Sequence, residues 1–76
     1  MATILPVQCW MARAVLGWSR RRLASIAGVS PQTVMRFEEG AALKASTIEE
    51  IERALESAGI VLIGAHDGGP GAKLNK

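Results

Sequence analysis

The chain has 76 residues, with a single cysteine, a single histidine and a net charge of +2. This length is sufficient for one small domain. Cys9 and His66 cannot supply an internal disulfide or a metal site built from cysteines or histidines, so we expect no cofactor. No apolar run approaches the ~18 residues of a membrane span, and no cationic segment precedes a signal-like run. We therefore expect a cytoplasmic protein of a reducing compartment, without membrane partners, in which association between copies supplements a small core.

The charges are unevenly distributed along the chain. Residues 1–37 contain five arginines and no acidic residue, whereas residues 38–58 contain six glutamates against Lys44 and Arg53. A cationic half beside an anionic half favours a polyanion bound on one side only. A solvated charged surface explains the same pattern, so charge alone leaves both interpretations open.

Two short helices are predicted first, each ending at a glycine. After Pro6, residues 7–16 place apolar side chains at helical spacing: Val7, Trp10, Met11, Ala14 and Val15. Gly17 ends this helix, and Ser19 is a good N-cap for a second helix at residues 20–27. Gly28 ends the second helix because glycine adopts positive φ without strain.

The third and fourth helices carry their own start signals. Ser30 caps the third helix, Pro31 follows at its first position, and the helix ends near Gly40. Thr47 and Glu50 fit a capping box for a fourth helix that ends at Gly59. Three apolar side chains of the fourth helix follow at core spacing: Ile48, Ile51 and Leu55.

The pattern changes after the fourth helix. Residues 60–63, IVLI, are typical of a strand, and residues 72–75 can return as a second strand after a glycine-rich turn. We therefore predict an all-α fold, a small bundle of four to five helices in residues 1–59. A short C-terminal β-strand or hairpin occupies residues 60–76.

The second and third helices are predicted to meet in a tight corner. Ala24 is small enough to let them approach closely, and Gly28 allows the sharp turn between them. The angle between the two helices is expected to be fixed by apolar side chains packed inside the corner: Val29, Val34 and Phe37. The later helix then projects outward, as in an αα corner.

Residues 12–40, ARAVLGWSRRRLASIAGVSPQTVMRFEEG, strongly resemble the lambda-repressor-like helix-turn-helix family, of the xenobiotic-response-element (Cro/C1) type. Leu-Gly-Trp-Ser, Leu-Ala, Ala-Gly-Val-Ser, Thr-Val and Phe-Glu-x-Gly occur in register, and with the fourth helix the resemblance covers residues 7–59. It implies a sequence-specific transcriptional regulator of bacterial or phage type, a repressor or activator. Such a regulator binds a palindromic operator in double-stranded DNA as a homodimer.

The resemblance also implies which side chains meet the bases, because the third helix of this family lies in the major groove. The groove-facing positions are Pro31, Gln32, Thr33 and Arg36. Gln32 matches the edge of adenine and Arg36 that of guanine. Pro31 offers only apolar contact, and Thr33 contacts either a base or a phosphate.

A second implied set fixes the protein on the phosphate backbone: Ser19, Arg20, Arg21, Ser30 and Lys44. The family usually has Gln where this chain has Arg20, which exchanges a neutral contact for a charged one and leaves its detailed role open. At most one of Arg21 and Arg22 joins this set, because successive side chains point in different directions around a helix.

Arg13 and Glu38 match an arginine of the first helix and a glutamate of the third that pair in phage repressors of this kind. The resemblance therefore implies a structural clamp that sets helix orientation more than overall stability. The alternative is two exposed residues in water, whose attraction is weak.

Several other residues receive structural interpretations. We expect Trp10 and Trp18 in the core or an interface rather than as stacking platforms for bases, and Cys9 as a small buried apolar residue. His66 and Asp67 are expected in an exposed turn. The sequence contains no metal-ligand cluster, glycine-rich phosphate loop or catalytic triad, so we predict no enzyme.

The strand at residues 60–63 extends past the helical core of the family. We expect Ile60, Val61, Leu62 and Ile63 to form the dimer interface, although a hairpin that only caps its own domain remains an alternative. The second functional hypothesis is an antitoxin-like or other protein-interaction module on the same fold. The acid-free, arginine-rich segment favours DNA, with contacts to polymerase or another regulator as further partners.

Overall fold

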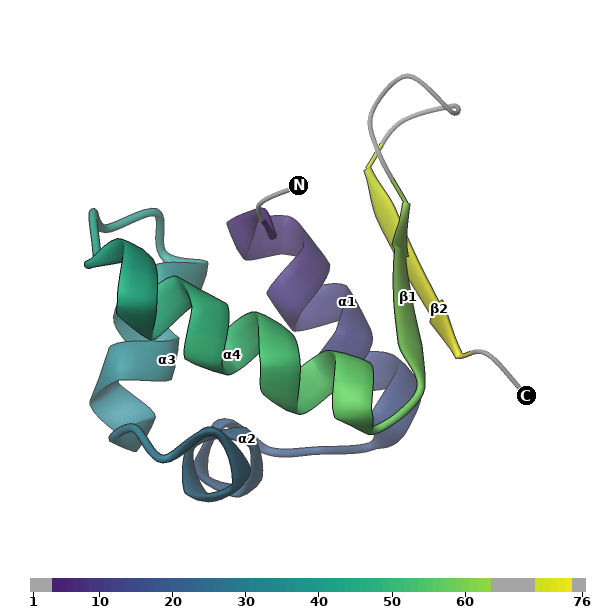
Figure 1. Ribbon diagram of the computed structural model, residues 1–76, viewed down its shortest axis with the longest axis horizontal. Coiled ribbons are helices and arrows are strands. Elements are labelled where there is room, and N and C mark those ends of the chain that lie inside the picture. Colours follow the sequence, from purple (N-terminus) through teal and green to yellow (C-terminus); the bar gives the residue numbers. More distant parts are fainter. Residues whose placement is uncertain (1–3, 64–69, 75–76) are drawn as a thin grey trace.

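The computed structural model describes residues 4–63 and 70–74. These residues form four helices and a hairpin: α1 (Pro6–Leu16), α2 (Arg20–Ala27), α3 (Pro31–Glu38), α4 (Ala45–Ser57), β1 (Ile60–Ile63) and β2 (Gly71–Leu74). In Figure 1, α4 crosses in front of α1, with α2 and α3 towards one end and the hairpin at the other. The predicted fold, a small helical bundle with a C-terminal hairpin, is confirmed. None of the described helices is long and apolar enough to cross a membrane.

One apolar core connects all the helices and the first strand. Its most deeply buried members are Ile4, Cys9, Ala12, Leu23, Ala24, Val34, Phe37, Ile51, Leu55 and Ile60. Helices α1, α3 and α4 each contribute buried side chains three or four positions apart, and α2 contributes the adjacent Leu23 and Ala24, so one face of each helix turns inward. Ile60 belongs to this core, and the chain is therefore anchored at the start of the hairpin.

The corner between α2 and α3 forms by the predicted turn chemistry. Gly28 has a φ of 77°, and its N–H donates to the carbonyl of Ala24 at 2.9 Å. The hydroxyl of Ser19 accepts the N–H of Arg22 at 3.0 Å, and that of Ser30 accepts the N–H of Thr33 at 3.1 Å. Both predicted N-caps are confirmed, so the two helix starts are fixed by short side chains.

The predicted start of α4 is wrong. The helix begins at Ala45, with Lys44 as an N-cap that makes no side-chain capping bond, and Thr47 lies inside the first turn. Leu43 and Ile48, at the two positions of a hydrophobic staple, both pack against the core. Apolar anchoring therefore sets where the chain enters this helix, and it overrides the capping box predicted for Thr47 and Glu50.

The side of α1 that faces the core is more polar than the outward side. Gln8, Cys9 and Ala12 are buried, whereas Val7 and Trp10 are exposed by 46% and 56%. Trp18 packs against the core as expected, but a core position for Trp10 is wrong. An interface role for Trp10 remains a prediction. The apolar side chains that indicated this helix thus include several that face away from the core.

The hairpin pairs β1 and β2 antiparallel, with Ile60 opposite Leu74 and Ile63 opposite Gly71. The second strand begins one residue earlier than predicted. The predicted turn between the strands, including His66 and Asp67, falls mainly outside the described residues.

Gln8 attaches this hairpin to α1. Its side-chain Nε2 donates to the carbonyls of Ile63 at 2.8 Å and Gly71 at 3.0 Å, and its Oε1 accepts the N–H of Leu5 at 2.8 Å. The glutamine is 4% exposed, so these bonds are shielded from water. The hairpin therefore packs on its own domain. The side chain that attaches it also accepts a backbone N–H at the start of α1 that would otherwise lack a partner.

We predict that Gln8→Ala lowers the free energy of unfolding by about 1–3 kcal/mol, because it leaves buried backbone groups without partners. Chemical denaturation measures the change, and amide hydrogen exchange should show faster exchange in β1. Gln32→Ala, on the exposed side of α3, is the matched control and should change stability by less than about 0.5 kcal/mol. Equal stabilities of the two variants would contradict this role for Gln8.

Candidate nucleic-acid interface

The carboxylate of Glu38 joins α1, α2 and α3. It accepts hydrogen bonds from the Nε of Arg13 at 2.7 Å and from the Nη2 of Arg13 at 2.8 Å, so the two side chains form a bidentate pair. It also accepts the Nε of Arg20 at 3.1 Å and the Sγ–H of Cys9 at 3.2 Å. The Glu38 side chain is only 4% exposed, so one buried carboxylate on α3 accepts hydrogen bonds from three residues of two other helices.

Arg13 extends this cluster into the loop before α2. Its Nη1 donates to the carbonyl of Trp18 at 3.1 Å, and the N–H of Trp18 donates back to the carbonyl of Arg13 at 2.9 Å. Gly17 between them adopts a φ of 70°, a conformation that favours glycine. The pair that the resemblance implied is thus a buried bidentate contact that also shapes the loop to α2.

The electrostatics of the cluster depend on burial. Desolvation acts to raise the pKa of Glu38, but hydrogen bonds from Arg13, Cys9 and Arg20 outweigh it and lower the pKa overall. Burial, with the hydrogen bond to Glu38, raises the pKa of the Cys9 thiol, so the thiol stays protonated and acts as a donor. The hydrogen bond to Glu38 raises the pKa of Arg13. The cluster therefore holds one carboxylate and two guanidinium groups, all charged at neutral pH.

The exposed side of α3 presents two polar side chains. Gln32 and Arg36 lie one turn apart on this helix, and both are exposed. Within residues 4–63 and 70–74, neither side chain makes a hydrogen bond to the protein. Val34 and Phe37, on the opposite side, are buried and seat the helix against the core. The outward side thus carries donors and acceptors that are free to meet a ligand.

The hydroxyls at the start of α3 are engaged with each other. The oxygens of Ser30 and Thr33 are 2.8 Å apart, and Ser30 also caps the helix through the N–H of Thr33. Thr33 is therefore directed towards the N-terminus of α3, beside Ser30, while Pro31 at the first position is exposed. Among the groove-facing residues that were predicted, only Gln32 and Arg36 have polar groups that are not already used locally.

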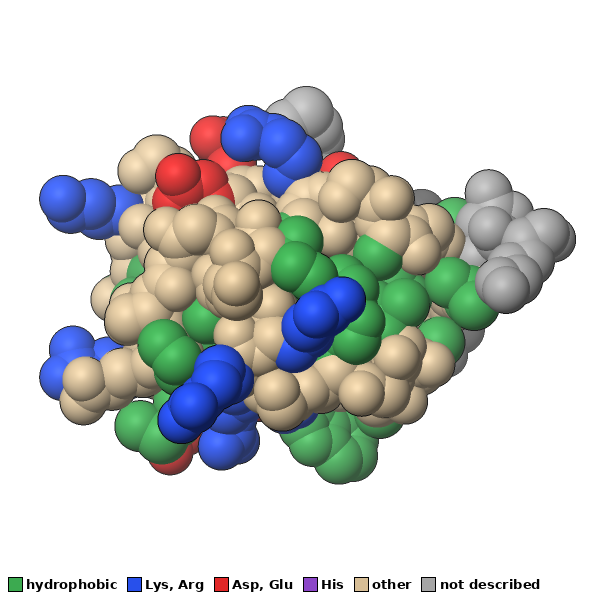
Figure 2. Space-filling model, turned by 90° about the horizontal axis from the view of Figure 1, so that it is seen from below, with side chains coloured by type: hydrophobic (Ala, Val, Ile, Leu, Met, Phe, Trp, Pro, Cys, Tyr) green, Lys and Arg blue, Asp and Glu red, His purple; other side chains and the backbone are tan. Residues whose placement is uncertain are grey.

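The remaining predicted phosphate contacts lie around this helix. Ser19 caps α2, Arg21 follows in its first turn, and Lys44 precedes α4; all three are exposed. Figure 2 shows Lys and Arg side chains (blue) spread over the lower face of the molecule, where α2 lies, and acidic side chains (red) mostly along one edge. Burial and the neighbouring charges of Glu56 and Glu49 raise the pKa of Glu52, which reflects this crowding of negative charge on α4.

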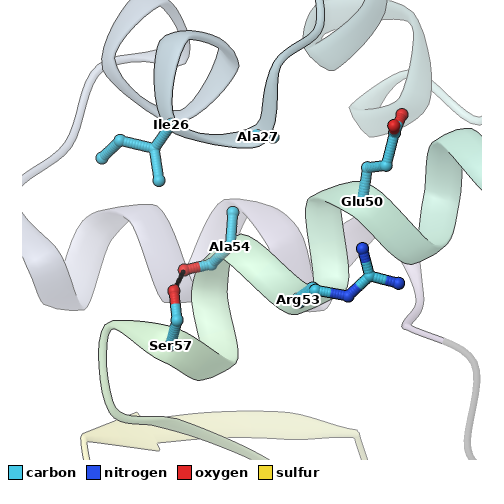
Figure 3. A pocket seen from close by; sticks show the side chains of 6 residues that line it. All are labelled: Ile26, Ala27, Glu50, Arg53, Ala54 and Ser57. Atoms are coloured by element: carbon cyan, nitrogen blue, oxygen red, sulfur yellow. Dashed lines mark hydrogen bonds between the residues drawn. The ribbon is translucent and has the colours of Figure 1, made fainter.

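A pocket of about 300 Å³ lies elsewhere, between α2 and α4. Figure 3 shows Ile26 and Ala27 on one side and Glu50, Arg53, Ala54 and Ser57 on the other. The hydroxyl of Ser57 donates to the carbonyl of Ala54 at 2.9 Å, so it is used within α4. The pocket includes none of the residues predicted to contact DNA.

Comparison with known proteins agrees with this geometry. The sequence model of the helix-turn-helix family matches residues 11–58, from α1 to the end of α4. The chain belongs to the Cro/C1-type helix-turn-helix family. No curated protein matches the chain. Membership makes this a DNA-binding helix-turn-helix regulator.

The family pattern did not reveal two of the contacts to Glu38. Arg20 was predicted only as a phosphate contact and Cys9 only as an apolar core residue, yet both donate to the same carboxylate. A signal existed for Cys9, because it stands four residues before Arg13 and so shares its helix face. No comparable spacing connects Arg20 to Glu38, which are 18 residues apart.

We predict that Glu38→Gln lowers the free energy of unfolding at pH 7 by about 3 kcal/mol, because it leaves the buried Arg13 without a counter-charge. The lowered pKa gives a second signature. Glu38 stabilises the fold fully above its ordinary pKa of 4.5, and this contribution is lost as the pH falls through the lower folded value. The variant should therefore lose less stability than the wild type in this acid range.

Denaturation at a series of pH values measures both effects. Glu39→Gln, at the exposed neighbouring position, is the control and should keep the acid dependence of the wild type. A Glu38→Gln curve parallel to the wild-type curve would show that Glu38 does not carry the charge on which the fold depends.

Proposed function

We propose that the protein is a sequence-specific transcriptional regulator that binds a palindromic operator as a homodimer in the cytoplasm. The observation that carries this proposal is the exposed side of α3, where Gln32 and Arg36 have no partner among the described residues. The opposite side of the same helix is seated by Val34 and Phe37 and fixed by Glu38. A rigid helix with free polar groups on one side is what major-groove recognition requires.

Each position on α3 has a distinct chemistry towards DNA. Arg36 presents a planar fork that matches O6 and N7 of guanine, and Gln32 can both donate to and accept from adenine. Pro31 supplies only apolar contact, for example with a thymine methyl. Thr33, whose hydroxyl lies beside Ser30, contacts a phosphate or a base at the start of the helix. Arg36 and Gln32 therefore carry the sequence preference.

Backbone contacts then fix the position of the helix on DNA. Ser19 and Ser30 keep hydroxyl groups at the starts of α2 and α3, where the helix dipole favours an anion. Arg21 and Lys44 add exposed positive charge on either side. The acidic α4 faces away from DNA in this arrangement and discourages docking in the wrong orientation.

Two copies are needed because half-sites of a palindrome lie about 34 Å apart along the duplex. We place the dimer contact on the β1 segment from Ile60 to Ile63 and its surroundings. Ile60 is in the core of its own domain, so the outward side chain of the strand is Val61, which is 37% exposed. The exposed apolar side chains of α1, which include Val7 and Trp10, can extend this contact.

Selection of duplexes from a random library tests the proposed function most directly, because it reports the preferred sequence and the half-site spacing. With the selected duplex, Arg36→Ala should weaken binding by about 1–3 kcal/mol and relax the preference at one base pair. Arg53→Ala, on α4, is the matched control and should bind with wild-type affinity and preference. A library that yields no shared pattern would favour the protein-interaction hypothesis, with an antitoxin-like role on the same fold.

Sedimentation of the Val61→Glu variant tests the dimer contact. A charge at this exposed position should shift the protein towards the monomer without unfolding it: Lys73, opposite on β2, can pair with it in the monomer, whereas burial of this charged pair at a subunit contact is costly. Lys73→Glu, directly opposite on β2, places the same charge on the neighbouring strand for comparison. If the Val61→Glu variant sediments as a wild-type dimer, the contact lies elsewhere.

A further inference from the structure

Arg20 lies between the buried Glu38 cluster and the surface predicted to meet DNA. It is the first residue of α2, its Nε donates to Glu38 Oε1 at 3.1 Å, and its side chain is 45% exposed. In the part of the chain that the structure describes, Nη1 and Nη2 of Arg20 make no hydrogen bond. One edge of this guanidinium is therefore held by the protein, and the other edge is left without a protein partner.

The charge of Arg20 is not needed to neutralise Glu38. Glu38 is already matched by Arg13, whose side chain is 13% exposed and which binds the carboxylate with two nitrogens. Cys9 is neutral and adds only a hydrogen bond. The cluster thus has one surplus positive charge, and the exposed member carries it. An anion outside the protein can use this charge without weakening the buried pair.

We propose that Glu38 is a positioning residue for DNA binding, which holds Arg20 so that its two terminal nitrogens bind one backbone phosphate. This inference rests on the proposed function and gives Arg20 a role distinct from that of the Gln usual in the family. A guanidinium can serve both partners because its five donors lie in a rigid plane and match a phosphate bidentately. Since Nε is already fixed, less side-chain entropy is lost when the phosphate binds.

Simple electrostatics predicts the opposite effect for Glu38. A carboxylate close to a phosphate repels it, so removal of its charge should strengthen binding to DNA. Positioning predicts weaker binding instead, and only while Arg20 is present. A clamp that acts only through Arg13 and the orientation of α3 predicts weaker binding whether or not Arg20 is present. The three explanations therefore differ in sign or in dependence on Arg20.

A double-mutant cycle on the duplex selected by the wild-type protein separates them. Arg20→Ala should weaken binding about tenfold, as expected for one charge-assisted contact, and should make the salt slope shallower by about 0.9, as for one lost phosphate. Glu38→Gln should weaken binding about fivefold alone and have little effect in the Arg20→Ala background. Stronger binding by Glu38→Gln, or equal losses in both backgrounds, would overturn the proposal.

Arg20→Lys keeps the charge at an exposed position and is the second variant, in case Glu38→Gln does not fold. Lysine has one terminal nitrogen and cannot hold Glu38 and a phosphate in a fixed plane. The Arg20→Lys protein should therefore bind nearly as weakly as Arg20→Ala, and wild-type affinity would refute positioning by Glu38. If the wild-type protein selects no duplex, the proposed function itself fails. If the wild-type protein selects a duplex and the variants bind it with wild-type affinity, only the role of Glu38 and Arg20 fails.

Discussion

One buried carboxylate constrains most of this structure. Glu38 cannot be left in the interior as an isolated charge, because an unpaired ion there is far costlier than one in water. Donors must therefore reach it, and they come from Cys9 and Arg13 on α1 and from Arg20 on α2. The relative orientation of three helices follows from satisfying this single group. Apolar contacts supply the bulk of the stability, and this group restricts the ways in which those contacts can be arranged.

The polarity of α1 is a consequence of that constraint. The helix must turn Cys9 and Arg13 towards Glu38, and Gln8 towards the carbonyls of the hairpin. These residues occupy adjacent parts of the helix surface, so Val7 and Trp10, on the opposite part, face outward. An amphipathic pattern alone assigns the apolar side to the core. In this chain Glu38 and the carbonyls of the hairpin both need hydrogen-bond donors from α1, and these needs decide which side of the helix faces inward. The apolar side of α1 is therefore exposed.

The same constraint connects packing with DNA binding. Helix α3 carries Gln32 and Arg36 one turn apart on its exposed side and Glu38 at its end. A helix fixed at its end by ion pairs, and along one side by Val34 and Phe37, presents its exposed side chains in a defined direction. Base recognition requires side chains whose direction is fixed in this way, because displacing a donor by a fraction of its hydrogen-bond length weakens the contact. The packing of this fold and the recognition proposed for it therefore depend on the same helix.

The sequence alone determined the family, the four helices, the strand at residues 60–63 and the caps at Ser19 and Ser30, because these depend on local spacing and on a motif in register. It also indicated the partners Arg13 and Glu38 through the resemblance. Only the tertiary structure decided which side of α1 is buried, where α4 begins, and that Arg20 and Cys9 share Glu38 with Arg13. These features depend on groups far apart in the chain that compete for the same buried partner. Apart from the four-residue spacing of Cys9 and Arg13, local sequence patterns contain no information about that competition.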